Sequence, residues 1–148
     1  MTLAFLDTNV PIYASGGPHE LRAPCKQILV LVAHHPHSFV TSAEVLQELL
    51  HRYLALRLWA QGRPAFTEFA ELMRDRVEPC TASDVEEAAR LADRHPELSA
   101  RDLLHAAVMH RLGVERVVSA DAGFDRLPGL QRLDPARFEE WSPVMGSY

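Results

Sequence analysis

The sequence has little cysteine and no long hydrophobic segment, and these absences exclude several classes of protein. Its two cysteines, Cys25 and Cys80, lie far apart and outside any CxxC pattern, so neither a disulfide framework nor a zinc site is expected. The longest apolar run, residues 28–33, is too short to span a membrane. The first residues lack the basic and long apolar segments of a signal peptide. We therefore expect a cytoplasmic protein with free thiols and no membrane association.

Lysine is almost absent, and acidic residues outnumber basic ones. Lys26 is the single lysine among 15 basic residues, whereas 20 residues are acidic, which gives a formal net charge of −5. This balance disfavours a protein that binds nucleic acid through its overall charge. Arginine makes planar, forked contacts with phosphate groups, although a GC-rich genome produces the same arginine bias.

Length and composition indicate one globular domain over residues 1–148. Hydrophobic residues make up 47% of the chain and charged residues 24%, which is ordinary for a folded protein. No segment rich in glycine, proline or serine is long enough to act as an interdomain linker. A single hydrophobic core is sufficient at this length.

Short apolar runs alternate with segments of helical periodicity along the chain. The predicted strands are 3–6, 38–41, 77–80, 116–119 and 131–133. The predicted helices are about 20–33, 43–60, 64–74, 83–93 and 100–112, the last of them ended by Gly113. Strands separated by helices favour an α/β fold, with a parallel sheet covered by helices on both faces.

Acidic residues follow two of the predicted strands. Asp7 comes directly after the first strand, and Asp121 and Asp125 come after the fourth. Open parallel sheets bind ligands at the carboxyl ends of their strands, which makes these positions candidates for a functional site. Aspartate is also a common helix cap and turn residue, so each carboxylate has a structural interpretation as well.

Two further acidic candidates lie on predicted helices. Glu48 lies among apolar residues, where a carboxylate is costly unless it is solvated, paired or metal-bound. Asp102 has the capping-box spacing from Ser99, but it opens a helix with few charges that we expect to be central. The same spacing between Thr81 and Asp84 is interpreted as purely structural.

The carboxylates of Asp7, Glu48, Asp102 and Asp121 are expected to meet in one cleft. Like charges so close together do not all remain ionised without a counter-charge, and a divalent cation supplies one. Ligands that are all oxygen suit Mg²⁺ or Mn²⁺, with one or two ions in the site. Such ions serve phosphoryl chemistry, which points to cleavage of a phosphodiester.

Four motifs in one order carry a resemblance to a known family. They are Phe5-Leu6-Asp7-Thr8-Asn9-Val10, Val45-Leu46-Gln47-Glu48-Leu49, Arg101-Asp102-Leu103-Leu104-His105-Ala106-Ala107 and Val117-Val118-Ser119-Ala120-Asp121-Ala122-Gly123-Phe124-Asp125. This pattern resembles the PIN-domain nucleases, and more closely the VapC toxins of bacterial toxin–antitoxin pairs. The resemblance extends from residue 3 to about residue 133.

The resemblance implies a fold, an activity and a set of site residues. The implied fold is a three-layer α/β/α sandwich with a parallel sheet of four or five strands. The implied activity is an endoribonuclease that depends on Mg²⁺ or Mn²⁺. The implied residues are an acidic quartet, a less regular fifth acid and two polar residues that orient the carboxylates: Asp7, Glu48, Asp102 and Asp121, then Asp125, then Asn9 and Ser119.

The resemblance also implies partners, and local chemistry adds candidates for RNA contact. The family implies a homodimer and a small VapB-like antitoxin whose C-terminal segment blocks the cleft. Arg52 and Arg101 are candidate phosphate contacts. His105 lies one turn after Asp102, and it is a candidate for RNA contact or for holding Asp102, although a packed core histidine is favoured.

Other functions remain alternatives to a toxin nuclease. They are a housekeeping PIN-type RNA-processing nuclease and a non-catalytic, antitoxin-binding module of the same fold. A phosphate-handling receiver domain is disfavoured, because Lys26 lies in a predicted early helix and not near an acidic strand end. Without the five candidate acids, the remaining 15 acidic residues equal the 15 basic ones, so the acidic charge does not argue against an RNA substrate.

Overall fold

Five short parallel strands form the centre of the fold. The structure is a computed structural model that describes residues 3–146, so four residues of the predicted domain 1–148 lie outside the described range. The strands are β1 (Ala4–Leu6), β2 (Phe39–Ser42), β3 (Val77–Glu78), β4 (Arg116–Val118) and β5 (Gln131–Leu133). They pair in the order β3-β2-β1-β4-β5, and every neighbouring pair is parallel.

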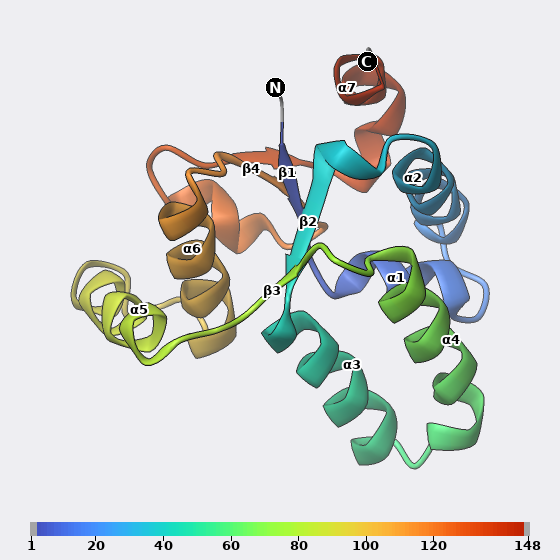
Figure 1. Cartoon of the computed structure of the whole chain (residues 1–148), viewed down its shortest axis with the longest axis horizontal. Helices are drawn as coiled ribbons and strands as arrows, with labels where there is room; N and C mark the ends of the chain where they lie inside the picture. The colour runs from blue at the N-terminus through green and yellow to red at the C-terminus, as the bar shows by residue number, and fades with distance from the viewer. Residues whose placement is uncertain (1–2, 147–148) are drawn as a thin grey trace.

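Helices cover both faces of this sheet. The described helices are α1 (Asn9–Ser15), α2 (Arg22–His34), α3 (Ala43–Ala55), α4 (Trp59–Leu72), α5 (Ala82–Arg94), α6 (Ala100–Leu112) and α7 (Phe138–Met145). Helices α5 and α6 lie on one side of the sheet, and α1, α2 and α4 lie on the other (Figure 1). The predicted α/β class, with a parallel sheet between helical layers, is confirmed.

The central strand β1 is the point at which the strand order of the sheet reverses. Ala4, Phe5 and Leu6 are completely buried, as expected for a strand with helices on both faces. From β1 the chain continues to β2 on one side, and it later returns to β4 on the other side. The strand order therefore reverses at β1, and the ends of β1 and β4 border the place where such sheets bind ligands.

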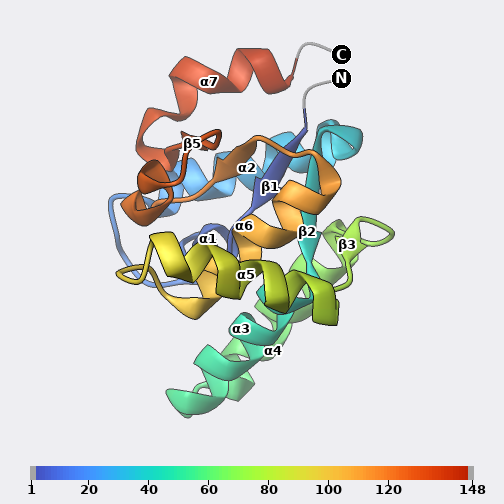
Figure 2. The same cartoon turned by 90° about the vertical axis from the view of Figure 1, so that its left-hand side faces the viewer.

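The helix predicted over residues 43–60 ends at Ala55, and the one predicted over 64–74 begins at Trp59, so both of these boundaries were wrong. Arg57 adopts a left-handed conformation with φ of 57°, and the Leu58 amide donates to the Tyr53 carbonyl. These are the features of a Schellman helix end, which is usually signalled by glycine. Helix α4 then begins at Trp59 and contains Pro64 in its interior. The hairpin of α3 and α4 extends beyond the sheet (Figure 2).

Two helices were not predicted, and both contain proline. Helix α1 includes Pro11, and α7 includes Pro143, so neither shows an uninterrupted helical pattern. Helix α6 has the predicted bounds, and Gly113 ends it with φ of 69°. Within residues 3–146, each helix is too short or too polar to span a lipid bilayer. Cys25 and Cys80 are free cysteines, as expected.

Candidate active site

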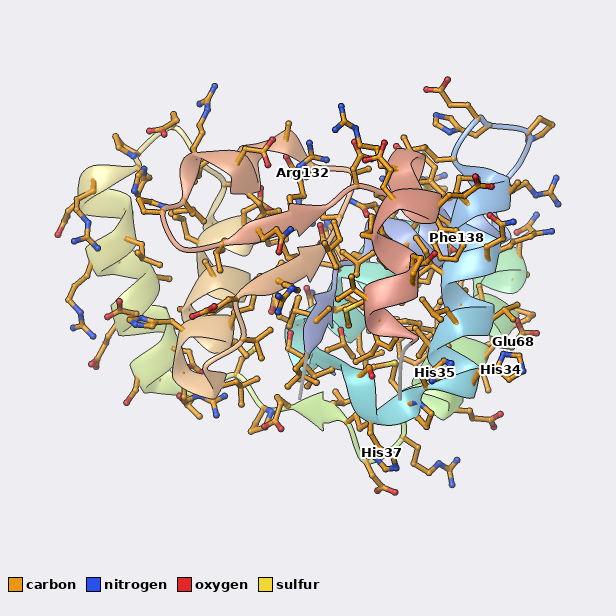
Figure 3. All side chains as sticks on the ribbon, turned by 90° about the horizontal axis from the view of Figure 1, so that it is seen from above. His34, His35, His37, Glu68, Arg132 and Phe138 are labelled. Carbon is orange, nitrogen blue, oxygen red and sulfur yellow. The ribbon has the colours of Figure 1, made fainter. Side chains whose placement is uncertain are left out.

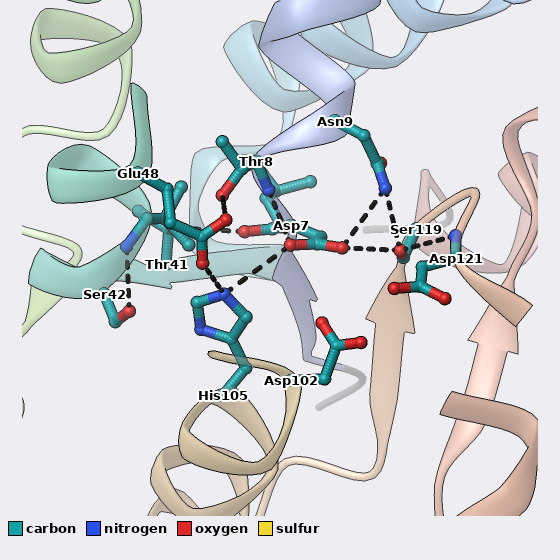
Figure 4. A network of polar contacts seen from close by, with 12 residues as sticks. Asp7, Thr8, Asn9, Thr41, Ser42, Glu48, Asp102, His105, Ser119 and Asp121 are labelled. Atoms are coloured by element: carbon teal, nitrogen blue, oxygen red, sulfur yellow. Dashed lines mark hydrogen bonds and ion pairs between the residues drawn. The ribbon is translucent and has the colours of Figure 1, made fainter. Parts of the chain in front are cut away.

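Asp7 lies at the centre of a polar network at the end of β1. Its carboxylate accepts from the Thr8 amide at 2.7 Å, from the Ser119 hydroxyl at 2.6 Å and from the Asn9 side-chain amide at 3.2 Å (Figure 4). The side chain is nearly inaccessible to solvent. Burial raises the pKa of Asp7, although nearby His105 and the hydrogen bonds oppose that shift. Asp7 is thus a buried carboxyl group with one charged neighbour, His105, whose Nε2 lies 3.7 Å from Oδ1.

Ser119 and Asn9 join the end of β1 to the end of β4. The Ser119 hydroxyl accepts from the Asn9 side-chain amide at 3.1 Å and from the Asp121 backbone amide at 2.9 Å. The Asn9 side-chain oxygen accepts from the Ala120 amide at 3.3 Å. Both predicted supporting residues therefore contact the candidate carboxylates or their backbone. Their hydrogen bonds fix Asp7 relative to the turn that carries Asp121.

Glu48 reaches the same network from α3, and both of its carboxylate oxygens are engaged. The Thr8 hydroxyl donates to Oε2 at 3.0 Å, and His105 Nε2 lies 2.6 Å from Oε1 (Figure 4). Burial favours a higher pKa for Glu48, but the bonds from His105 and Thr8 outweigh it and lower the pKa. Conversely, the carboxylates of Glu48 and Asp7 raise the pKa of His105 despite its burial. Glu48 and His105 thus form a buried ion pair.

Asp102 and Asp121 both line the cleft, and their side chains lie close together (Figure 4). The Asp102 amide donates to the Ser99 side chain, which caps α6, so the predicted cap is confirmed while the Asp102 carboxylate remains available to the cleft. Burial, together with the neighbouring charges of Asp121 and Asp7, raises the pKa of Asp102 to about 7. If both carboxylates are ionised, they repel each other, and this repulsion favours the protonated form of Asp102.

The four predicted acidic residues line one cleft of about 450 Å³. Its lining includes Asp7, Glu48, Asp102 and Asp121, with Arg52 and Arg101 among the other residues. Both arginines are exposed. The cleft therefore combines a buried acidic centre with exposed cations that come from two different helices, α3 and α6.

Two of the predicted site residues lie differently from the prediction. His105 is completely buried, as the favoured interpretation of a packed core histidine predicted, and it is paired with Glu48, so the alternative of RNA contact was wrong. Asp125 does not line the cleft; it accepts two hydrogen bonds from Arg132 at 3.0 and 3.1 Å. The structure therefore separates Asp125 from the other four acidic residues.

The side chains that line the cleft have the chemistry that suits a divalent cation. Asp7, Asp102 and Asp121 provide carboxylate oxygens, and no cysteine lines the cleft. Gly123 leaves room beside them, because a Cβ atom at this position would lie 3.1 Å from Asp121 Oδ1 and 3.6 Å from Asp102 Oδ2. Among the described residues, the ligand atoms of Asp7, Glu48 and His105 lie within 4.8 Å of one another, but His105 and Glu48 already bind each other.

Two residues of the network were not singled out from the sequence. Thr8 belongs to the segment that follows β1, but its hydroxyl bonds to Glu48, which is 40 residues away in the chain. Arg132 lies on β5 and contacts Asp125 and the Ser119 carbonyl. The only sequence signal for Thr8 is its position directly after Asp7. Arg132 has no such signal, because it meets its partners only when β5 pairs with β4 in the sheet.

Comparison with known proteins establishes the family. The PIN domain family matches residues 4–130. The chain is 38% identical to Ribonuclease VapC13 of Mycobacterium tuberculosis over 131 residues, which covers 88% of this chain and 99% of that protein. The chain belongs to the PIN-domain family, among the VapC ribonucleases. Ribonuclease VapC23 of the same species is 43% identical over 122 residues, covering 80% of this chain and 93% of that protein. The predicted resemblance is confirmed.

Solved structures share the fold of this PIN domain. The VapBC2 complex of Rickettsia felis, bound to a DNA fragment from its promoter, contains a chain with a TM-score of 0.69 at 18% identity. The match covers 90% of this chain and 98% of that one. The Mycobacterium tuberculosis toxin VapC20, which cleaves the sarcin–ricin loop, has a TM-score of 0.67 at 25% identity, with 82% and 92% covered. The predicted fold class is thus confirmed by its neighbours.

Proposed function

We propose that this PIN domain is an endoribonuclease that hydrolyses RNA phosphodiester bonds with the help of Mg²⁺ or Mn²⁺. The observation that carries the proposal is the convergence of Asp7, Asp102 and Asp121 in one cleft. These carboxylates come from the ends of β1 and β4 and the start of α6, and burial together with the nearby Asp121 and Asp7 raises the pKa of Asp102. The VapC ribonucleases among its relatives support the same conclusion.

Asp7, Asp102 and Asp121 would hold the cation, and Glu48 would support the site from the side. A bound divalent cation would supply a water molecule of lowered pKa and would stabilise charge that develops on the phosphate. We propose that the site holds one or two such ions. Ser119, by donating to Asp7, keeps that carboxylate oriented before substrate arrives, which is how residues around ligands tune a metal site.

The Glu48–His105 ion pair lies next to Asp7, because His105 Nε2 is 2.6 Å from Glu48 Oε1 and 3.7 Å from Asp7 Oδ1. Because both oxygens of Glu48 are hydrogen-bonded, its carboxylate is held in one orientation. His105 is buried, so water does not compete with Glu48 for its hydrogen bond. We propose that this pair positions Asp7 and Glu48 relative to one another and does not contact substrate.

Arg52 and Arg101 are proposed to bind the RNA backbone. Both line the cleft and are exposed, and they belong to α3 and α6, which lie on different sides of the acidic centre. Guanidinium groups bind phosphate oxygens in a forked geometry, which positions a nucleic acid without reading its sequence. Single-stranded or looped RNA is the expected form of the substrate, because its bases and backbone are accessible.

The biological role proposed is that of the toxin in a toxin–antitoxin pair in the cytoplasm. The curated relatives are VapC ribonucleases, and a structural neighbour is a VapBC2 complex. We propose that a small VapB-like antitoxin blocks the cleft, that the active protein is a homodimer, and that the described region acts as one catalytic domain.

Removal of a single candidate ligand tests the proposed activity. Asp102→Asn preserves the size of the side chain and removes its charge, and we expect cleavage of an RNA pool to fall by at least about 100-fold. Excess EDTA should abolish cleavage by the unaltered protein, and added Mg²⁺ or Mn²⁺ should restore it. Cleavage is measured by gel electrophoresis of end-labelled RNA.

Asp93→Asn is the matched control for this substitution. Asp93 is an exposed aspartate on α5 and does not line the cleft. Its variant should cleave RNA as fast as the unaltered protein. Equal activity of the Asp102→Asn and Asp93→Asn proteins, or full activity in EDTA, would exclude the proposed metal-dependent site.

A further inference from the structure

Arg132 is an enclosed cation that is not part of the cleft. It lies in the middle of β5, the strand at one edge of the sheet, and is labelled in Figure 3. Only 15% of its side chain is exposed. Its guanidinium donates to both oxygens of Asp125, at 3.0 Å from Nε and 3.1 Å from Nη2. The forked geometry fixes the plane of the guanidinium.

The remaining nitrogen of this guanidinium reaches the backbone of the active-site network. Arg132 Nη1 donates to the Ser119 carbonyl at 3.2 Å and lies 3.4 Å from Asp134 Oδ2. On the opposite side of the same residue, the Ser119 hydroxyl donates to Asp7 and accepts from the Asp121 amide. Ser119 is therefore held by Arg132 from outside the cleft while it holds two candidate ligands inside it.

We propose that Arg132 is a positioning residue of the nuclease site and that Asp125 acts by holding Arg132, not by binding the metal. This inference rests on the proposed function. It explains why an acidic residue near Asp121 lies outside the cleft. Loss of Arg132 removes the donor to the Ser119 carbonyl, and loss of Asp125 leaves the guanidinium with Asp134 as its carboxylate partner. Either change loosens the position of Ser119, which its amide bond to the Leu133 carbonyl alone then ties to β5, and with it the hydrogen bonds to Asp7 and Asp121. Residues that orient metal ligands in this way typically change metal affinity about 10- to 100-fold.

The chain contains a second pair with the same geometry, which provides a matched control. Arg111 donates to both oxygens of Asp84, at 2.9 and 3.2 Å, and to the Pro79 carbonyl at 2.8 Å. This pair links α6 to the start of α5, and neither residue lines the acidic cleft. A substitution there removes an arginine–carboxylate fork and a bond to a carbonyl without affecting Ser119.

The test measures Mn²⁺ binding to the purified full chain by electron paramagnetic resonance, together with thermal unfolding. The variants are Arg132→Gln, Asp125→Asn and the control Arg111→Gln. We expect the first two to weaken Mn²⁺ binding by about 10-fold. Arg111→Gln should lower the melting temperature but leave the Mn²⁺ Kd within about twofold, since it lies outside the network.

A double variant and a conservative variant separate positioning from general stability. Because Arg132 and Asp125 act through one contact, the double variant should bind Mn²⁺ no more weakly than Arg132→Gln alone. Arg132→Lys keeps the charge but loses the fork, so it should recover only part of the affinity. If Arg132→Gln does not fold, Asp125→Asn and Arg132→Lys provide the same comparison.

Three results would overturn the inference. One is an unchanged Mn²⁺ Kd in the folded Arg132 and Asp125 variants. Another is loss of Mn²⁺ binding in Asp125→Asn as severe as in Asp102→Asn, with Arg132→Gln unaffected, which would make Asp125 a ligand. The third is an equal effect of Arg111→Gln on the Mn²⁺ Kd. Failure of the unaltered protein to bind Mn²⁺ would instead contradict the proposed function itself.

Discussion

At the residue scale, neighbouring carboxylates in the cleft have pKa values shifted in opposite directions. Burial raises the pKa of Asp7, whereas hydrogen bonds from His105 and Thr8 lower that of Glu48 despite its burial. His105 Nε2 lies 2.6 Å from Glu48 Oε1 but 3.7 Å from Asp7 Oδ1, so Glu48 has the closer protein cation of the two. We therefore expect a divalent cation to be bound most favourably on the side of the cleft that contains Asp7, Asp102 and Asp121.

Asp84 provides a prediction about pH at this same scale. Burial favours a higher pKa for Asp84, but hydrogen bonds from Arg111 and Thr81 outweigh it and lower the pKa below 3.8. A lowered pKa in the folded state stabilises the protein above the unfolded pKa, and this stabilisation is lost as pH falls through the folded value. Asp84→Asn should therefore cost about 2 kcal/mol at pH 7, and less below about pH 4.

Chemical denaturation at several pH values measures this effect. Asp93→Asn, an exposed change on the same helix, should leave the free energy of unfolding unchanged throughout the range. A difference between Asp84→Asn and the unaltered protein that stays constant from pH 7 to pH 3 would contradict the assignment of a stabilising ionised Asp84.

Local spacing predicted some residue roles, and others depended on contacts between distant segments. The capping box of Thr81 and Asp84 is present as predicted, since it needs only four consecutive residues. The burial of His105 depends on Glu48, which is 57 residues away. The separation of Asp125 from the cleft depends on Arg132, which a neighbouring strand supplies. No local pattern contains such pairings.

At the scale of elements, the hairpin of α3 and α4 is joined by one close contact. A Cβ atom at Gly62 would lie 2.1 Å from the ring of Tyr53, so the two helices approach there without a side chain between them. The Tyr53 hydroxyl also lies 3.1 Å from the Ser15 hydroxyl on α1. Since α3 carries Glu48 and Arg52, this contact fixes one wall of the cleft.

Gly62→Ala tests that contact. Alanine favours a helix by about 1 kcal/mol over glycine, so helix propensity alone predicts stabilisation. The steric clash with Tyr53 predicts the opposite, a loss of about 1–3 kcal/mol. Thermal unfolding distinguishes these outcomes, and Gly17→Ala is the control because no atom lies within 4 Å of its Cβ position. A Gly62→Ala protein more stable than the unaltered one would show that the helices are not closely packed there.

Elements were predictable where periodicity and end signals agreed. Helix α6 combines the Ser99 cap with Gly113 in a left-handed conformation, and its bounds were predicted. The end of α3 was missed because Arg57, an unusual residue for a left-handed position, takes the place of glycine. Both prolines inside the missed helices disguised a helical pattern that packing stabilises, since α1 and α7 both pack against α2.

At the scale of the whole molecule, topology assembles the site. The sheet order places β1 between β2 and β4, so that residues 7 and 121, which are far apart in the chain, lie at one edge. Alternating strands and helices predicted this architecture, and right-handed crossovers leave few other arrangements. Four acidic residues meet in the cleft, and the exposed Arg52 and Arg101 line the same cleft, so the net charge of −5 does not describe its rim.

The central claim is that this cleft hydrolyses RNA by water attack that depends on a divalent cation. The chemistry of the RNA ends produced by the purified protein tests it most directly, because attack by water leaves linear phosphate and hydroxyl ends, whereas attack by the 2′-hydroxyl leaves a 2′,3′-cyclic phosphate. Mass spectrometry of a defined oligonucleotide digest distinguishes the two. We predict linear ends, formed only with Mg²⁺ or Mn²⁺ and not by the Asp102→Asn protein. Cyclic phosphate ends, or cleavage that persists in excess EDTA, would contradict the claim.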